Sequence, residues 1–189
     1  IKTEFNTADD AFVYFYDLIR NEGFDFDNTK ALLNIGFTIH SPLDNAIFAK
    51  FRNWNHKYAK REWEWYLSGD PNAEEISKKA PIWCHHMDAN GEVRSNYGWQ
   101  WKRSNQLDYI ISKLNDKPDT RHAAITIYDA KEWPTYTHDT PCTYAVQFTI
   151  INNKLNMSVL MRSNDLWFGF CNDQYCFSLL QQKVAEELN

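Results

Sequence analysis

Cys142 is the residue of this sequence whose side chain could act most directly in chemistry. It lies in a Thr-Pro-Cys-Thr segment at 140–143, directly before a run of strand-forming residues. A cysteine thiolate is a strong nucleophile, so this position could form a covalent bond to a substrate. The alternative is a small buried apolar residue, which is the usual role of a free cysteine. We expect that second role for the other three cysteines, Cys84, Cys171 and Cys176.

Glu62 is the candidate for proton transfer. Its neighbours on a predicted helix include Trp63, Trp65 and Tyr66. Aromatic side chains can exclude water from a carboxyl group, which raises its pKa and suits it to proton transfer near neutral pH. The alternative is a solvated glutamate on the outer face of an amphipathic helix.

Arg162 and Ser163 form a candidate phosphate-binding pair where a predicted strand ends. The planar guanidinium group and the hydroxyl group both match the oxygens of a phosphate. The alternative is a surface salt bridge between Arg162 and Asp165, which would contribute little to stability.

The composition limits the classes of protein to which the chain can belong. A length of 189 residues fits one domain with its own core. The net charge of -5 argues against a nonspecific nucleic-acid-binding protein, which needs a basic surface. The four cysteines have neither CxxC nor zinc-ligand spacing, so we expect free thiols in a cytoplasmic protein without a metal site. No apolar run approaches the roughly 18 residues of a membrane span.

The hydrophobic pattern predicts an α+β fold, with helices packed on a mixed, largely antiparallel sheet. A Thr-Ala-Asp-Asp segment at 7–10 resembles a capping box and starts the first helix. Apolar residues at helical spacing predict helices over residues 8–21, 57–67, 106–114 and 175–188. Strand-forming runs cover residues 31–39, 122–128, 143–151 and 154–160, with a turn at 88–91 and a hairpin turn at 152–153. No linker interrupts the chain, so we expect one domain over residues 1–189.

Seven sequence blocks, in one order along nearly the whole chain, resemble the thymidylate synthase superfamily. They are EWEWYLSGD at 62–70, PIW at 81–83, NYGWQW at 96–101, PDTR at 118–121, PCT at 141–143, QF at 147–148, and MRSND with a later glycine at 161–169. Each block alone is weak, whereas seven blocks in order are specific. The resemblance implies a thymidylate-synthase-like fold in a single domain. It also implies that a C-terminal segment is lacking, because the chain ends before the His-x-Tyr segment with which relatives bind the sugar hydroxyl.

Within the superfamily, the sequence resembles the phage deoxycytidylate hydroxymethylases more than the synthases themselves. The resembling segments are SNYGW at 95–99, CT at 142–143, and MRSND, FGF and ND within 161–173. The residue after the nucleophile is usually His in the synthases and is Thr143 here.

The resemblance makes Asp173 the residue that selects the base, because it falls where the synthases place the Asn that pairs with uracil. An Asn amide accepts from N3 of uracil and donates to O4. A carboxylate accepts from the amino group of cytosine, and also from N3 once N3 is protonated in the covalent adduct. Asp173 therefore favours cytosine, and unpaired polar groups in a buried site would disfavour uracil.

The resemblance implies conversion of dCMP to 5-hydroxymethyl-dCMP with 5,10-methylenetetrahydrofolate and water, through a covalent adduct of Cys142 at C6 of the base. Glu62 would relay protons and position the water, with Tyr97 supporting the proton network and Asp173 holding the base. The implied substrate-binding residues are Arg121, Arg162, Ser163, Gln147, Asp173 and Lys30. The implied folate-binding residues are Trp83, Asp165 and Gly169. The family's arrangement also implies a homodimer in which Arg121 reaches the partner's active site.

Departures from the family pattern leave other functions open. The second Arg of an Arg-Arg pair in relatives is His122 here, and Lys30 stands in a loop where the synthases carry an Arg. A thymidylate synthase or a dUMP hydroxymethylase would require Asp173 to tolerate uracil. A CMP hydroxymethylase is an alternative because the sugar-binding segment is not in the sequence. Outside the enzymes, the alternative is an inactive relative that binds a nucleotide.

Overall fold

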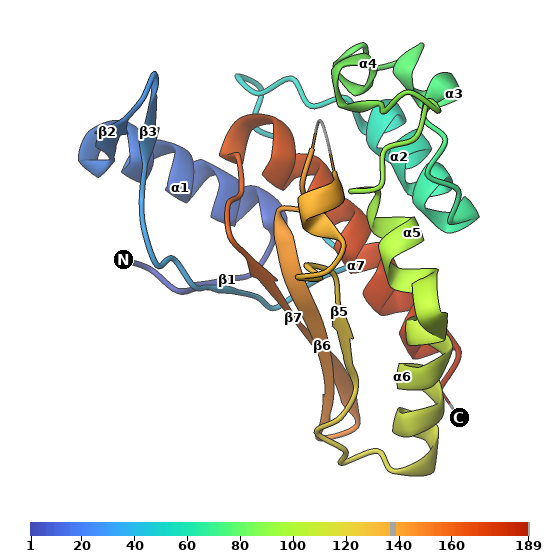
Figure 1. Cartoon of the computed structure of the whole chain (residues 1–189). Helices are drawn as coiled ribbons and strands as arrows, with labels where there is room; N and C mark the ends of the chain where they lie inside the picture. The colour runs from blue at the N-terminus through green and yellow to red at the C-terminus, as the bar shows by residue number, and fades with distance from the viewer. Residues whose placement is uncertain (137–138, 189) are drawn as a thin grey trace. The chain divides into compact units, whose positions relative to one another are not determined.

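The structure is a computed structural model that describes residues 1–136 and 139–188 (Figure 1). It divides into two compact units, and each is described by itself. Unit 1 comprises Ile1–His56 and Asp165–Ser178, and unit 2 comprises Lys57–Asn164 and Leu179–Asn189. The single domain over residues 1–189 stays a prediction.

Unit 1 contains a helix whose start is fixed by its own sequence. Helix α1 spans Ala8–Glu22. The Asp10 amide donates to the Thr7 hydroxyl and the Thr7 amide donates to the Asp10 carboxylate, each at 3.1 Å, which confirms the predicted capping box. The strands of this unit are short: β1 (Glu4–Phe5) pairs in parallel with β4 (Thr38–Ile39), and β2 (Phe24–Phe26) pairs antiparallel with β3 (Thr29–Ala31).

The core of unit 1 forms where α1 packs against a π-helical segment, η3 (Leu166–Phe170), which leads directly into helix α7 (Cys171–Glu186). The wide turn is closed by a hydrogen bond from the Phe170 amide to the Asp165 carbonyl at 2.7 Å. The buried residues of this core are Phe5, Ala8, Ala11, Phe12, Phe15, Ile47, Phe170 and Cys171. Short π-helical turns occur frequently at functional sites, so η3 is a candidate position for a functional site.

Besides the C-terminal part of α7, the described part of unit 2 contains five α-helices. They are α2 (His56–Ser68), α3 (Glu74–Ser77), α4 (Ile82–His86), α5 (Tyr97–Lys102) and α6 (Gln106–Asp116), with 3-10 turns η1 (Arg103–Asn105) and η2 (Trp133–Thr135). Helix α2 ends where Gly69 takes a φ of 69°, a conformation that glycine adopts without strain. The Gly69 amide then donates to the Tyr66 carbonyl at 3.1 Å.

The sheet of unit 2 is antiparallel in the order β5-β6-β7, with β5 at Ala124–Thr126, β6 at Thr143–Ile151 and β7 at Lys154–Met161 (Figure 1). Strands β6 and β7 are joined at Asn152 and Asn153, which have φ values of 51° and 58°. A type I′ hairpin turn requires positive φ at both central residues, so the predicted hairpin is confirmed. The register pairs Thr143 with Met161, which brings the residues just outside the strands opposite one another.

Gly98 allows two helices of unit 2 to approach very closely. A Cβ atom at this position would lie 1.8 Å from the backbone carbonyl oxygen of Tyr66 in α2. Real Cβ atoms do not approach that closely, so only glycine fits here. The close approach brings α5, which begins with Tyr97, against α2.

Two predicted elements differ from the structure. The prediction of one strand over residues 31–39 was wrong, because only Thr29–Ala31 and Thr38–Ile39 are strands. Between them, Asn34 takes a φ of 56° and Leu33 is exposed. The last helix begins at Cys171 rather than 175, because polar side chains in its first turn bond within unit 1 instead of following an apolar period. The predicted turn at 88–91 is present, with the Gly91 amide donating to the Asp88 carbonyl at 3.0 Å.

Among the described residues, no helix is both long and apolar enough to cross a membrane.

Candidate active site

Cys142 and Arg162 are held together at the open end of the β6–β7 hairpin. The guanidinium Nη2 lies 3.7 Å from the Cys142 sulfur. It also donates to the carbonyl and hydroxyl oxygens of Thr140, each at 3.1 Å, while Nε donates to the Pro141 carbonyl at 3.0 Å. The Arg162 amide donates to the Cys142 carbonyl at 2.8 Å. A cation beside the sulfur is the arrangement that stabilises a thiolate.

The other cysteines differ from Cys142 in their surroundings. All four are free thiols, as predicted, and Cys142 is half-buried. Cys171 and Cys176 are buried, also as predicted, and burial raises the pKa of the Cys171 thiol to about 11, so it stays protonated at neutral pH. The buried role predicted for Cys84 was wrong, because this residue is exposed on the short helix α4, which buries none of its residues.

Replacing Arg162 with Gln is expected to slow alkylation of Cys142 by iodoacetamide about tenfold at pH 7, because the thiolate loses the adjacent positive charge. Alkylation of each cysteine is followed over time by peptide mass spectrometry. Cys84 is the internal control, since it is exposed and distant in sequence from this contact. An unchanged rate at Cys142 would mean that the guanidinium does not activate the sulfur.

Glu62 is buried in unit 2, with an exposed fraction of 4%. The Tyr66 hydroxyl donates to Oε1 at 2.8 Å. Oε2 is buried and receives no hydrogen bond of standard geometry from the described residues, although the Tyr58 hydroxyl interacts with the carboxyl group. Burial raises the pKa of Glu62 from 4.5 to about 7, and the two tyrosine hydroxyls partly oppose that rise. The predicted desolvation of this carboxyl group is therefore confirmed.

The unmodified protein is expected to lose stability as the pH rises to neutral and basic values, and the Glu62→Gln variant is expected not to show this loss. A carboxyl group whose pKa is raised on folding contributes stability below pH 4.5 and loses that contribution as the pH rises through about 7. The difference between these two pKa values corresponds to about 3 kcal/mol. Between about pH 4.5 and pH 8, the free energy of unfolding of the unmodified protein should fall by that amount relative to the variant.

Urea titrations of both proteins across this pH range measure the difference. Replacing Glu64 with Gln on the same helix is the matched control, because Glu64 is exposed. Equal pH dependence in the unmodified protein and in Glu62→Gln would show that Glu62 is ionised at neutral pH like an ordinary carboxylate.

Tyr97 and Trp83 each contact a tyrosine that interacts with Glu62. The ring centroid of Tyr97 is 5.8 Å from that of Tyr66, the residue that donates to Glu62. Trp83 donates from its indole Nε1 to the Tyr58 hydroxyl at 2.8 Å. Unit 2 therefore places the predicted catalytic pair Glu62 and Tyr97 and the predicted pocket wall Trp83 around one set of tyrosines.

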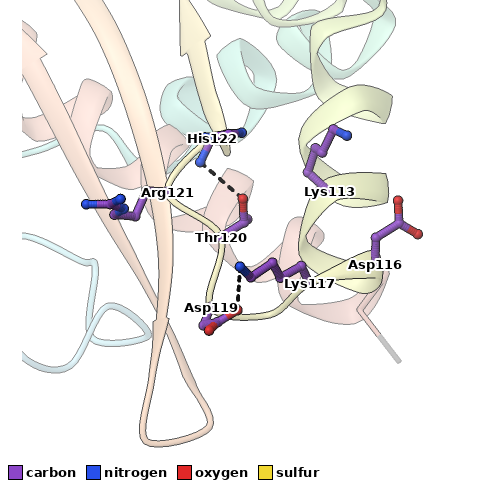
Figure 2. Close-up of a pocket in the computed structure, with 7 residues that line it drawn as sticks. All are labelled: Lys113, Asp116, Lys117, Asp119, Thr120, Arg121 and His122. Carbon is purple, nitrogen blue, oxygen red and sulfur yellow. Dashed lines mark hydrogen bonds and ion pairs between the residues drawn. The ribbon is translucent and has the colours of Figure 1, made fainter.

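Arg121 lies on the loop between α6 and β5, at the edge of a pocket of about 240 Å³. The pocket is lined by Lys113, Asp116, Lys117, Asp119, Thr120, Arg121 and His122 (Figure 2). Figure 2 shows the Arg121 side chain directed away from Lys113 and Asp116. Arg121 is exposed, and none of the described residues forms an ion pair with it. Its guanidinium group is therefore available to another molecule.

Gln147 and Ser163 occupy different environments in unit 2. Gln147 is half-buried in the central strand β6, between Ala124 of β5 and Ser158 of β7. Ser163 is exposed and directly follows Arg162 at the end of β7. Their predicted contacts with substrate stay predictions.

Asp173, predicted to select the base, and Asp165 and Gly169, predicted to bind folate, lie in unit 1, whereas Trp83 lies in unit 2. Asp173 is half-buried near the start of α7, which continues directly from η3. The adjacent Asn172 accepts from Trp54 Nε1 at 2.9 Å and donates to the Phe168 carbonyl at 3.2 Å, so its amide is used within the unit. Asp165 caps η3: its Oδ1 accepts from the amides of Phe168 at 2.5 Å and Gly169 at 3.4 Å.

Lys30 is engaged within its own hairpin in unit 1. Its ammonium group donates to the Gly23 carbonyl at 3.2 Å and lies 3.3 Å from the Asp25 carboxylate. A role in binding substrate would compete with these two contacts and stays a prediction.

Sequence reasoning missed Tyr58 and Thr140. Tyr58 stands four residues before Glu62, a spacing that places both side chains on one face of a helix, so the signal was present in the sequence. Thr140 was identified only as a neighbour of Cys142, and its contact with Arg162 depends on the strand register. Within residues 1–136 and 139–188, no group of three or more His, Cys, Asp or Glu side chains could hold a metal ion.

Comparisons with known proteins agree with the residue patterns. The family model for thymidylate synthase matches residues 23–189. The chain is 37% identical over 144 residues to the deoxycytidylate 5-hydroxymethyltransferases of Enterobacteria phages T4 and T2, covering 71% of this chain and 58% of each relative. The chain thus spans less than two thirds of the length of these curated relatives.

Solved structures include a similar fold. The thermostable thymidylate synthase A from Bacillus subtilis matches with a TM-score of 0.70 and 21% identity, over 94% of this chain and 72% of that chain. The predicted thymidylate-synthase-like α+β fold is confirmed.

Proposed function

This chain belongs to the thymidylate synthase family, and from that premise we propose that it converts dCMP to 5-hydroxymethyl-dCMP as a cytoplasmic homodimer. The observation that carries the proposal is the distance of 3.7 Å between the Arg162 guanidinium group and the sulfur of Cys142. A half-buried thiol beside a cation is suited to nucleophilic attack on a pyrimidine ring.

Cytosine as the base is supported by Asp173 and by the names of the relatives. A carboxylate accepts from the amino group of cytosine, and uracil has no such donor at C4. The neighbouring amide of Asn172 is bonded within unit 1, so it is a weaker candidate for pairing with a base. The relatives from phages T4 and T2 are named for deoxycytidylate.

The proposed steps use Cys142 and Glu62. The Cys142 sulfur would bond to C6 of the base, and the electrons of the C5–C6 double bond would move to C5, which becomes a carbon nucleophile. Glu62, with a pKa of about 7, is present in both protonation states near neutral pH. It can therefore donate a proton to the ring and accept one from the water that becomes the hydroxyl group. Once C5 carries the one-carbon unit, loss of the C5 proton would expel the folate amine and leave an exocyclic methylene group on C5. Water would add to this methylene carbon, and the electrons returned to C5 would expel the sulfur from C6 and restore the double bond.

Methylenetetrahydrofolate, when bound, would supply the one-carbon unit. Trp83 fits a planar pterin, because its half-buried indole is fixed by a hydrogen bond to Tyr58 and by a ring contact with Trp65 at 5.1 Å. The folate contacts of Asp165 and Gly169 are proposed from the resemblance alone.

The test is to incubate the full-length protein with methylenetetrahydrofolate and dCMP, CMP or dUMP in separate reactions, and to identify the products by mass spectrometry. We expect hydroxymethylated dCMP, and none in a control without the folate. Methylated dUMP without any hydroxymethylated cytosine nucleotide would contradict the proposal and identify a thymidylate synthase. Product from CMP alone would identify a ribonucleotide enzyme, and no product from any nucleotide would favour an inactive relative.

The proposed homodimer places Arg121 in the partner's active site. Arg121→Ala and Cys142→Ser homodimers should each be inactive, whereas a mixture of the two refolded together should recover about a quarter of the unmodified activity. Half of all dimers in the mixture contain one subunit of each variant, and one of the two sites in each such dimer has an intact Cys142 and an intact Arg121. An inactive mixture of two inactive variants would show that Arg121 acts within its own subunit, whereas an active Arg121→Ala homodimer would show that Arg121 is not needed.

A further inference from the structure

Three side chains share one face of helix α2. Tyr58, Glu62 and Tyr66 follow one another at intervals of four residues, so their side chains lie along one line on the helix surface. The Tyr66 hydroxyl donates to Oε1 of Glu62 at 2.8 Å. The carboxyl group is therefore flanked by a tyrosine hydroxyl on each side.

Trp83 determines how the Tyr58 hydroxyl can be used. The indole Nε1 lies 2.8 Å from the Tyr58 oxygen. An indole N–H is only a donor, so the Tyr58 oxygen must accept this bond, and its own O–H proton points elsewhere. Glu62 lies one turn further along the same face of α2, so its carboxyl group is an acceptor within reach of that proton. A hydroxyl that accepts one hydrogen bond becomes a better donor in the next.

The groups around Glu62 are tyrosines rather than charges. Tyr58 and Tyr66 come from α2, Tyr97 of α5 contacts the ring of Tyr66, and His86 of α4 contacts the ring of Trp83 at 5.8 Å. The pKa of Glu62 is raised by burial and lowered by the hydroxyls of Tyr66 and Tyr58, with no charged neighbour contributing. Changing one hydroxyl donor should therefore change the titration of Glu62 measurably.

We propose that Tyr58 is a positioning residue that connects Trp83, in the wall of the folate pocket, to the carboxyl group of Glu62. Trp83 donates to Tyr58, and Tyr58 donates to Glu62. The proposal rests on the proposed function, which gives Trp83 its contact with folate and Glu62 its proton. A pterin placed against the indole would then act on the proton carrier through one tyrosine, so that folate binding and proton transfer are coupled.

The test measures the titration of Glu62 without any substrate. For each variant, the free energy of unfolding is compared with that of the same variant carrying Glu62→Gln, from about pH 5 to about pH 9. Tyr58→Phe removes a donor that favours the charged carboxylate, so the fall in stability should move to a pH higher by about one. Trp83→Phe keeps Tyr58 but removes the N–H that orients it. The pH at which stability falls should therefore also rise, by about half as much.

Tyr109→Phe is the matched control, because Tyr109 is exposed on α6, and its titration curve should coincide with that of the unmodified protein. A shift in Tyr58→Phe with none in Trp83→Phe would overturn the connection, as would the absence of a shift in both. If Tyr58→Phe does not fold, Trp83→Phe alone decides, because an unshifted curve contradicts the proposal and a shifted one supports it. This readout does not depend on product formation, so it is separate from failure of the proposed reaction.

Discussion

Replacing Cys142 with Ser is expected to abolish formation of hydroxymethylated nucleotide, by about 10⁴-fold or more. A serine hydroxyl is almost entirely protonated at neutral pH and is a weak nucleophile, whereas the thiol lies beside the Arg162 guanidinium group, at 3.7 Å. The substitution is small, and the backbone bond from Arg162 to the carbonyl of residue 142 can persist. The expected loss is therefore chemical rather than structural.

Three measurements separate these two causes. Product formation is measured by mass spectrometry, the binding of dCMP by calorimetry, and the free energy of unfolding by urea titration. Cys142→Ser should bind dCMP with little change and unfold normally. Cys84→Ser is the matched control, since this exposed thiol should be dispensable. Robust turnover in Cys142→Ser would reject a covalent mechanism, whatever the product is.

The contact between Cys142 and Arg162 could be anticipated from the sequence only to within one residue. A two-residue turn at Asn152 and Asn153 places residues at equal distances from it opposite one another, which would put Ser163 opposite Cys142. The register shifts by one residue between Thr143 and Ala145, and this shift brings Arg162 to Cys142 instead. The strand patterns over 143–151 and 154–160 were correct to within one residue. Local periodicity and turn chemistry therefore bring the predicted nucleophile to the predicted phosphate-binding pair, but the register shift that selects Arg162 could not be predicted from them.

The hydrogen bonds around Glu62 could be anticipated only in part. Aromatic neighbours in the sequence left a desolvated and a solvated carboxyl group as alternatives, and the structure shows that Glu62 is buried. The bond from Trp83 to Tyr58 was not predictable, because α4 has five residues, too few to show a helical period. The close approach of α5 to α2 at Gly98 was not predictable either, because a glycine in a sequence does not indicate which backbone it packs against.

The failed strand over 31–39 has a related cause. Its apolar residues satisfy the pattern of a buried strand, but that pattern does not record backbone conformation. Asn34 takes a positive φ, which Asn tolerates better than most residues, and Leu33 is left exposed. Apolar composition alone therefore could not distinguish this irregular segment of unit 1 from a strand.

Replacing Asp173 with Asn is expected to move base preference from cytosine toward uracil. The carboxylate only accepts hydrogen bonds, whereas an amide also donates, so the variant can pair with the N3 proton and O4 of uracil. In a desolvated site, the mismatched base leaves polar groups unpaired. The ratio of kcat/KM for dCMP to that for dUMP should therefore fall by about 10²-fold or more.

Competition between dCMP and dUMP in one reaction, with products separated by mass spectrometry, measures this ratio directly. Asp108→Asn is the matched control, because it makes the same chemical change at an exposed position of α6. Free energies of unfolding of both variants show whether the loss of a charge from the first turn of α7 has a structural effect. If the ratio is unchanged in a folded Asp173→Asn enzyme, then Asp173 does not contact the base. Selection of cytosine would in that case depend on another residue, while the roles of Cys142 and Glu62 would be unaffected.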